Sequence, residues 1–261
     1  MMLVDPDRVE PDGGSKCRLV DAIEYELPFG LVADLLAGSA VRNKPARMFQ
    51  YRHRVAADDI ACHQRFRKMS PMQILMTGSS GLVGSSLVAF LTTGGHSVVR
   101  LMRGAPPSVG TSVTWDPAAG QIDAAGLEGF DAVVHLAGES IAARRWSTKQ
   151  KELIRSSRVT GTRLLCESLA RLAKPPQVLV SASAIGFYGD CGDSTMTESS
   201  AAGSGFLSVV CRDWEAATEP AVTAGIRVVH LRLGIVLSPA GGALAKMLTP
   251  FRMGIAGKMD S

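Results

Sequence analysis

The sequence predicts an α/β protein built on a doubly wound parallel sheet, preceded by a short segment of different character. From about residue 71 onward, short apolar segments alternate with longer helical ones, and glycines follow the first apolar segment at a regular spacing. The chain has 261 residues, of which 46% are hydrophobic, enough to bury a sizeable core. We therefore divide it into residues 1–70 and residues 71–261.

Composition narrows the class of protein. The formal net charge is +4 and the pI is near 8.9, and basic residues gather only in "RMFQYRHR" and "RFRK", which favours a solvated face over a nucleic-acid surface. No apolar stretch approaches the roughly 20 residues that span a bilayer. The 5 cysteines include no CxxC pair and follow no signal sequence, which indicates a reducing cytoplasm. We expect a cytoplasmic protein, compatible with a homo-oligomer, with no metal, nucleic-acid or membrane partner.

Residues 1–70 carry too few elements for a domain of their own. The stretch "CRLVDAIEYELP" alternates apolar and polar residues, as a half-buried strand does. A helix is expected from Leu31, with a break at Pro45 and an amphipathic continuation to about Phe66. One strand and one or two helices cannot enclose an independent core, so this segment is predicted to be part of a larger domain.

The second segment carries the pattern of a parallel sheet covered on both faces. Its strand-like runs are short, rich in valine, apolar on both faces and bounded by turn residues. Helices are predicted where parallel strands need crossovers. The expected strands are residues 72–78, 97–103, 111–116, 131–138, 177–183 and 226–234, and the expected helices are 82–93, 148–172 and 205–224.

The glycines of "MTGSSGLVGSSL" have a mechanistic interpretation. Gly78, Gly81 and Gly84 lie between the first strand and the first helix. In such a bend one glycine permits the tight turn, the next lets the backbone approach a pyrophosphate, and the last lets helix and strand pack closely. The positive N-terminus of the helix then faces the phosphates. The spacing therefore predicts a dinucleotide site.

Several segments in order resemble the extended short-chain dehydrogenase/reductase superfamily, in its NAD-dependent epimerase/dehydratase group of unassigned substrate. They are "TGSSGLVG", "DAVVHLAGESIAARRWSTKQKELIRSSRVTGTRLL", "VSASAIGFYGDCGD", "GFLSVVCRDWEAA" and "LRLGIVLSPAGGALAKMLTPFRMG". The resemblance covers about residues 72–254 and implies a Rossmann-like domain. Family members continue past this point, so we expect a chain truncated after the cofactor domain. The first segment is similar to the last strand and helix of an α+β START-like (polyketide cyclase/dehydrase) domain.

The resemblance also implies the cofactor-binding residues. "HLAG" at residues 135–138 ends the fourth strand, where the superfamily's backbone lies along the adenine-ribose side of the cofactor. A lone histidine at a strand end is more often structural, so His135 receives no proton-transfer role. Arg158 stands where the superfamily has an asparagine, a departure that bears on its active-site water relay. The residues assigned to the cofactor are Thr77, Gly78, Ser80, Gly81, Leu82, Val83, Gly84, Arg103, Leu136, Ala137, Gly138 and Ser181.

Arg103 bears on which nicotinamide cofactor is used. An NAD-selective site places an acidic residue at the end of the second strand to bind the ribose hydroxyls. Arg103 follows that strand here, and its guanidinium could hold a 2′-phosphate through paired hydrogen bonds. NADP(H) is therefore favoured over NAD(H). The alternative is that Arg103, like Arg100, is a solvated charge at a strand end.

Only part of the superfamily's catalytic set is present. Ser183 matches the serine that binds the substrate oxygen, with Ser181 as a second candidate. The superfamily's Tyr-x-x-x-Lys pair, in which lysine lowers the pKa of the tyrosine, is missing, because alignment puts Leu207 and Cys211 at its positions.

Several other residues could take the place of the missing Tyr-x-x-x-Lys pair. Tyr188 could act as a substitute acid beside an unidentified cation, or its ring could simply pack in the loop. Glu198, or Cys211 with a water molecule, could serve instead, although Cys211 is more readily interpreted as a small buried hydrophobe. The chain could also bind a dinucleotide without turnover.

Candidate substrate contacts follow the fourth and sixth strands. Arginines beside an aromatic ring in "ARRWSTK" could clamp an anionic or sugar-like substrate, or they could form a solvated turn. The candidates are Glu139, Arg145, Trp146 and Arg232, and "PFRMG" is expected to begin the substrate-side portion.

The sequence therefore favours an NADP(H)-dependent oxidoreductase or epimerase/dehydratase-like enzyme acting on a small sugar-like or carbonyl molecule. The alternative is a catalytically silent dinucleotide-binding regulator, which the description of some relatives as cell-division inhibitors keeps open. A role in ligand carriage through the START-like segment is weakened by the incompleteness of that segment.

Overall fold

The computed structural model divides the chain into two compact units, Met1–Lys68 and Met69–Ser261, which we term the N-terminal unit and the α/β unit. The structure describes residues 2–4, 8–14, 17–20, 23–25, 30–104, 112–142 and 144–255.

The N-terminal unit consists of paired short strands and one long helix. β1 (Met2–Val4) pairs antiparallel with β4 (Ile23–Tyr25), and β2 (Arg8–Pro11) pairs antiparallel with β3 (Cys17–Val20). The helix α1 spans Gly30–Phe66. Its assignment to a START-like domain stays a prediction.

Two expectations for this unit were wrong. The predicted single strand in "CRLVDAIEYELP" contributes β3 and β4, which pair with different partners, and β3 is largely exposed rather than half-buried. Alternation alone did not reveal this division. The predicted helix break is also absent, because α1 continues through Pro45. Proline removes only one backbone donor from a helix of 37 residues.

The α/β unit is built on a seven-stranded sheet in the order β11-β10-β9-β5-β6-β7-β8. All neighbouring strands run parallel except β8, which pairs antiparallel with β7. The chain passes from the β5 side to the β9 side of this order, so the point between β5 and β9 is where a doubly wound sheet binds ligands. The strands are β5 (Gln73–Thr77), β6 (Ser97–Met102), β7 (Ser112–Asp116), β8 (Gln121–Ile122), β9 (Ala132–His135), β10 (Val178–Ala184) and β11 (Arg227–Leu233).

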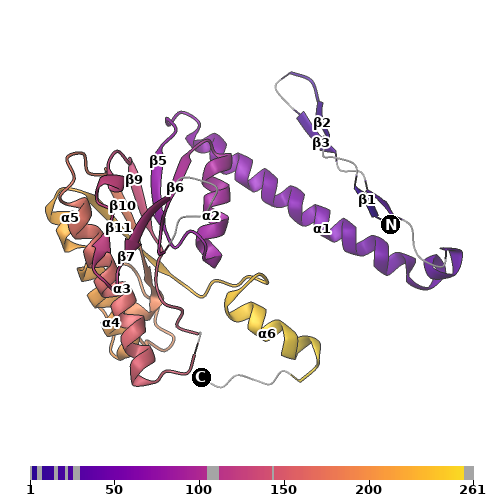
Figure 1. The fold of residues 1–261 in the computed structure, drawn as a ribbon. Helices are drawn as coiled ribbons and strands as arrows, with labels where there is room; N and C mark the ends of the chain where they lie inside the picture. The colour runs from indigo at the N-terminus through magenta and orange to yellow at the C-terminus, as the bar shows by residue number, and fades with distance from the viewer. Residues whose placement is uncertain are drawn as a thin grey trace. The chain divides into compact units, whose positions relative to one another are not determined.

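Helices cover both faces of this sheet. Figure 1 shows α2 on one face and α3, α4 and α5 on the other. The doubly wound fold and the expected strands are confirmed, but the expected helix 205–224 is two helices. Pro220 lies in the first turn of α5 and cannot donate a backbone hydrogen bond to the preceding helix, which ends α4. The helices are α2 (Leu82–Thr93), α3 (Thr148–Leu169), α4 (Phe206–Ala216), α5 (Glu219–Thr223) and α6 (Gly242–Arg252), with the short 3₁₀ helices η1 (Ala125–Leu127) and η2 (Ile185–Tyr188).

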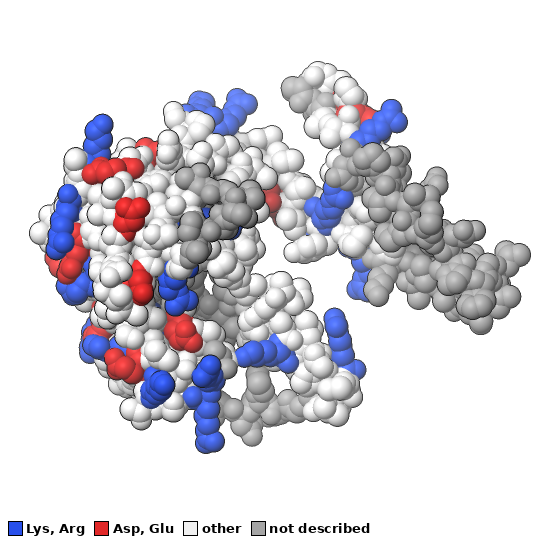
Figure 2. Space-filling model, in the orientation of Figure 1, with Lys and Arg blue, Asp and Glu red and all other residues white. Residues whose placement is uncertain are grey.

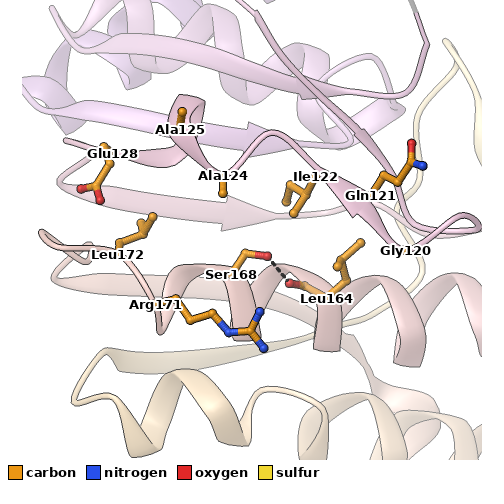
Figure 3. A pocket seen from close by; sticks show the side chains of 10 residues that line it. All are labelled: Gly120, Gln121, Ile122, Ala124, Ala125, Glu128, Leu164, Ser168, Arg171 and Leu172. Carbon is orange, nitrogen blue, oxygen red and sulfur yellow. Dashed lines mark hydrogen bonds between the residues drawn. The ribbon is translucent and has the colours of Figure 1, made fainter.

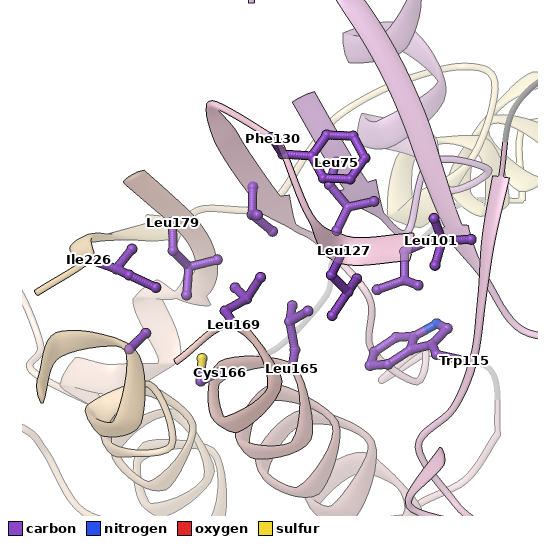
Figure 4. Close-up of a cluster of buried hydrophobic side chains, with 13 residues drawn as sticks. Leu75, Leu101, Trp115, Leu127, Phe130, Leu165, Cys166, Leu169, Leu179 and Ile226 are labelled. Atoms are coloured by element: carbon purple, nitrogen blue, oxygen red, sulfur yellow. The ribbon is translucent and has the colours of Figure 1, made fainter. Parts of the chain in front are cut away.

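Alternation along each strand fills a core on either side of the sheet. On β5, Ile74 and Met76 belong to the cluster that packs on α2, whereas Leu75 belongs to the cluster that includes Leu165 and Leu169 of α3. Figure 4 shows this second cluster. Because side chains alternate between faces, a strand buried on both sides reads as a continuous apolar run, as the sequence predicted.

A buried hydrogen-bond chain crosses the centre of the unit. His135 Nδ1 lies 2.7 Å from Thr77 Oγ1, and His135 Nε2 lies 2.8 Å from Thr162 Oγ1, which accepts from Trp214 Nε1 at 2.9 Å. Thr77 Oγ1 also accepts two backbone N–H groups, from Leu136 and Ala137. The Thr77 proton is therefore donated to Nδ1, and the neutral imidazole carries its own proton on Nε2. This assigns His135 a structural role.

Acid is expected to destabilise the unit through His135. Burial lowers the pKa of His135 to about 4, against about 6.5 in the unfolded chain. The stability that depends on a neutral imidazole is complete above the unfolded value and is lost as the pH falls toward the folded value. The free energy of unfolding should fall by about 2 kcal/mol between roughly pH 8 and pH 5 through this group. Urea unfolding of wild type and His135→Asn should give different pH slopes; equal slopes would contradict the assignment.

The surface of the α/β unit carries charges of both signs. In Figure 2, Lys and Arg side chains are interspersed with Asp and Glu side chains over its visible face. Among the described helices, none is both long and apolar enough to cross a bilayer.

Candidate functional site

The glycine bend between β5 and α2 forms a corner without room for side chains. Gly78 has φ +67°, and a Cβ there would lie 2.7 Å from the carbonyl carbon of Leu136. A Cβ on Gly84 would overlap the carbonyl oxygen of Gly78. Gly81 is the N-cap residue of α2, and its N–H donates to the Gly78 carbonyl at 3.0 Å. Glycine is therefore required at positions 78 and 84, for conformation and for close packing respectively.

A cavity of about 1080 Å³ opens beside this corner, at the carboxyl edge of the parallel strands. No side chain caps the N-terminus of α2, so the backbone N–H groups of its first turn remain available to a ligand. The lining residues come from the ends of β5, β6, β7 and β9 and from α3. They are Gly78, Ser79, Ser80, Gly81, Leu101, Met102, Arg103, Gly104, Trp115, Asp116, Pro117, Ala118, Leu136, Ala137, Gly138, Glu139, Leu153, Ser156, Ser157 and Thr160.

Several residues assigned to the cofactor from the sequence do not line this cavity. Thr77 is fully buried and holds the chain after β9 against the glycine corner through its bonds to Leu136 and Ala137. Leu82 packs against Gly241, where a Cβ would lie 3.3 Å from its Cδ1. Ser181 is buried within β10, and Val83 is half-buried in α2. Their direct roles in cofactor binding stay predictions, and Thr77 acts here by positioning its neighbours.

A second polar cluster lies at the carboxyl ends of β10 and β11. Ser183 and Arg232 are paired in register on these strands. Ser183 Oγ donates to Glu215 Oε1 at 2.6 Å, and Arg232 holds the same carboxylate through Nε and Nη2, both at 2.9 Å. Arg232 Nη1 also donates to the Tyr188 hydroxyl at 3.0 Å. The structure thus brings the predicted residues Ser183, Tyr188 and Arg232 together, around a glutamate that the sequence analysis had not selected.

The charges in this cluster stabilise one another. Burial acts to raise the pKa of Glu215, but hydrogen bonds from Arg232 and Ser183 and the charge of Arg232 outweigh it and leave the pKa below its usual value. The hydrogen bond with Glu215 raises the pKa of Arg232 in turn. The Arg232 guanidinium also lies 3.5 Å from the centroid of the Phe187 ring. Arg232 is therefore the cation beside Tyr188, and it is fixed on two sides.

The residues at the positions of the missing Tyr-x-x-x-Lys pair, and the alternative candidate Glu198, lie in less suitable places for acid/base chemistry. Cys211 is buried, and burial raises the pKa of its thiol, so it is a neutral packing residue. Leu207 packs against Gly186, where a Cβ would lie 3.3 Å from the Leu207 Cβ. Glu198 is exposed and contributes its backbone carbonyl to Arg232 at 3.2 Å.

Arg158 contacts the residues behind the cavity and the Trp214 ring of α4. Its Nη1 donates to the carbonyl oxygens of Glu139 at 2.9 Å and Ile154 at 3.1 Å, and its Cζ lies 5.2 Å from the centroid of the Trp214 ring. A Cβ on Gly138 would lie 3.3 Å from that Cζ. The residue that departs from the superfamily pattern therefore lies against the wall of the cavity.

Of the other residues predicted to contact the substrate, one lines the cavity and two do not. Glu139 lines the cavity. Trp146 donates to the Ile141 carbonyl at 2.8 Å and packs edge-on against Phe206, and Arg145 is exposed. Neither Arg145 nor Trp146 is among the described residues that line the cavity. Their role in substrate binding stays a prediction.

Sequence reasoning missed other residues of the site. Glu215 lies on the inward face of α4, four residues after the buried Cys211, and a carboxylate on an otherwise apolar helix face was the available signal. Ser79, which is buried and lines the cavity, followed a glycine and gave no distinct signal. Residues 116–118 reach the cavity from the end of β7, where the sequence analysis had assigned no ligand contact.

A smaller cavity of about 570 Å³ lies between β8, η1 and α3 (Figure 3). Its lining shares no residue with the larger cavity. Ser168 donates to the Leu164 carbonyl at 2.8 Å, and the Glu128 carboxylate accepts the N–H groups of Ala173 and Lys174. Because these polar groups already have internal partners, the candidate site is the larger cavity with its adjoining cluster.

Residues 74–256 match the NAD dependent epimerase/dehydratase family. The epimerase family protein Mb2239 of Mycobacterium bovis is 42% identical over 193 residues, which are 74% of this chain and 63% of that protein. The human epimerase family protein SDR39U1 is 36% identical over 194 residues, which are 73% of this chain and 63% of that protein.

Solved structures agree with these matches. A nucleoside-diphosphate sugar epimerase from Corynebacterium glutamicum superposes with a TM-score of 0.78 and 38% identity, over 97% of this chain and 50% of that one. Human SDR39U1 isoform 2, crystallised with NADPH, gives a TM-score of 0.62 and 33% identity, over 71% of this chain and 61% of that one. The chain spans 63% of these curated relatives and half of the Corynebacterium protein. Because the family match extends over residues 74–256, the chain belongs to the NAD dependent epimerase/dehydratase family.

Proposed function

We propose that the α/β unit binds NADP(H) and uses it in an oxidoreductase or epimerase/dehydratase-like reaction on a small sugar-like or carbonyl molecule. The observation that carries the proposal is the glycine corner, where Gly78 and Gly84 leave no room for side chains beside a cavity of about 1080 Å³. Such a corner fits a diphosphate, which needs exposed backbone N–H groups and close approach of the main chain.

The residues around the cavity suit the remaining parts of the cofactor. The first turn of α2 would hold the diphosphate, and residues 136–138 would lie along the adenine-ribose side. Arg103 lines the cavity just after β6, where its guanidinium would hold a 2′-phosphate. The NADPH in the human SDR39U1 crystals supports this preference by likeness.

When bound, the nicotinamide would exchange a hydride with a substrate carbon. Ser183 donates its proton to Glu215, so its oxygen is left to accept a hydrogen bond from a substrate hydroxyl. Tyr188 accepts a hydrogen bond from Arg232, so its own proton is left for donation to a substrate oxygen. Ser183 and Tyr188 thereby offer one acceptor and one donor in place of the missing Tyr-x-x-x-Lys pair.

A fluorescence titration tests the cofactor preference. Wild type should bind NADPH about tenfold more tightly than NADH, because paired charge-assisted bonds to a phosphate contribute at least about 1.4 kcal/mol. Arg103→Gln should remove the preference and leave the NADH affinity unchanged. Arg100→Gln is the matched control, because Arg100 lies on β6, the strand that Arg103 follows, and is not among the described residues that line the cavity. Equal affinities of wild type for both cofactors would exclude the role of Arg103.

Turnover tests the remainder of the proposal. NADPH consumption across a panel of carbonyl and sugar-nucleotide substrates should identify an activity that Ser183→Ala and Tyr188→Phe reduce while their NADPH affinity is retained. Binding of NADPH by wild type without turnover of any substrate would favour a dinucleotide-binding regulator instead.

A further inference from the structure

We propose that the Arg158 guanidinium recognises an anionic group, a carboxylate or a phosphate, of the substrate. This inference rests on the proposed function and adds to it the charge of the molecule that the site accepts.

Among the described residues, Arg158 forms hydrogen bonds through one of its three nitrogens. Nη1 donates to the backbone carbonyls of Glu139 and Ile154. Nε and Nη2 donate to none of the described residues. A guanidinium carries its donors in a rigid planar fork, and the free edge formed by Nε and Nη2 matches the two oxygens of a carboxylate or phosphate.

The charge of Arg158 also lacks a close counter-ion. No carboxylate of a described residue lies within 4.0 Å of it, although the more distant Glu139 carboxylate acts to raise its pKa. Burial outweighs that effect and lowers the pKa. Arg155 and Arg232, by contrast, pair with Asp213 and Glu215 at 2.8 and 2.9 Å. A partly buried charge is costly unless an opposite charge pairs with it. Arg158 lacks such a partner among the described residues, so a bound anion would stabilise it.

The guanidinium lies directly behind the cavity wall, although Arg158 is not itself among the described residues that line the cavity. The Trp214 ring covers it at 5.2 Å, and Gly138, at the wall of the cavity, presents no side chain to it. Because Nη1 bonds the carbonyl of Glu139, which lines the cavity, an anion on Arg158 would lie beside the cofactor cavity, next to a bound cofactor.

The coenzyme is the other source of phosphate oxygens. The first turn of α2 and the glycine corner already provide backbone donors for its diphosphate, and Arg103 lies where a 2′-phosphate would be. Arg158 is held by the chain after β9 rather than by that corner. We therefore assign its free edge to the substrate.

Calorimetric titration with malonate and with inorganic phosphate tests this assignment. Wild type, with and without saturating NADPH, should bind at least one probe, and Arg158→Met should weaken that binding at least about tenfold. Arg155→Met is the matched control: it removes an arginine from the same helix that is already paired with Asp213, and it should bind the probe as wild type does. NADPH affinity should be the same in all three proteins.

Absence of binding of either probe to wild type, or equal binding to Arg158→Met, would overturn the inference. A selective loss of NADPH affinity in Arg158→Met would also overturn it and assign the guanidinium to the coenzyme. If Arg158→Met does not fold by circular dichroism, Arg158→Lys, which keeps the charge but not the fork, must show the weakened probe binding. Failure of wild type to bind NADPH would reject the proposed function, whereas the titration without NADPH would still test Arg158.

Discussion

Gly84→Ala is expected to abolish NADPH binding and to destabilise the α/β unit by about 3 kcal/mol, the upper range for overpacking a core. A Cβ at this position would overlap the carbonyl oxygen of Gly78 and lie 2.9 Å from the Ser79 Cα, so β5 and α2 would have to separate. The amides of the glycine corner would move with them. We expect an affinity loss of at least about 100-fold, measured by fluorescence titration.

The sign of the stability change makes this prediction specific. Glycine to alanine within a helix ordinarily stabilises by up to about 1 kcal/mol, because alanine has the higher helix propensity. A loss of stability therefore requires the close contact with Gly78. Gly234→Ala is the control, because nothing lies within 4 Å of a Cβ there, and its effect should stay within about 0.5 kcal/mol. Unaltered NADPH binding by Gly84→Ala would disprove the diphosphate site at this corner.

Glu215→Ala is expected to destabilise the unit by about 3 kcal/mol or more, measured by urea unfolding at neutral pH. The side chains of Glu215 and Arg232 are only 12% and 20% exposed, so removing the carboxylate leaves a poorly solvated guanidinium without its two bonds. Ser183 loses its acceptor in the same step. Removal of both charges in Glu215→Met/Arg232→Met should recover much of the loss, because no unpaired charge then remains.

Asp213→Ala provides the control for Glu215. Asp213 lies on the same helix and pairs with Arg155, but these side chains are 27% and 46% exposed, so its loss should be below about 1 kcal/mol. The contribution of Glu215 should also depend on pH. The folded pKa of Glu215 lies below the unfolded value of about 4.3, so its contribution is complete above that value and is lost as the pH falls through the folded pKa. Equal losses for both variants would show that the buried pair has no special role.

The sequence was sufficient for the parts of the fold that depend on local pattern. The six parallel strands were predicted because each is a short apolar run between turn residues, and the glycine corner because its steric requirements leave a fixed spacing. Pro220 indicated the break between α4 and α5. The sequence analysis nevertheless predicted one helix, because the helical periodicity continues across this proline. In the N-terminal unit, alternation in one stretch could not distinguish a single strand from two strands with different partners.

The site was harder to predict because its contacts join residues distant in sequence. Ser183, Tyr188 and Arg232 could be selected one at a time from the strand ends. Glu215 bonds both Ser183 and Arg232 because α4 packs beside β10, and the sequence does not specify that packing. The same holds for Arg158, whose free edge is apparent only once its neighbours in space are known.

The central position of β5 has a consequence for how the protein is made. β5 pairs with β6, which follows closely, but its other neighbour β9 begins only at Ala132, and the Gly78 wall is formed by Leu136. While the ribosome is still translating the segment between β6 and β9, the glycine turn lacks the wall that the chain after β9 provides. The coenzyme therefore cannot assist the earliest stage of folding on the ribosome, and it can act as a ligand chaperone only after β9 has left the exit tunnel.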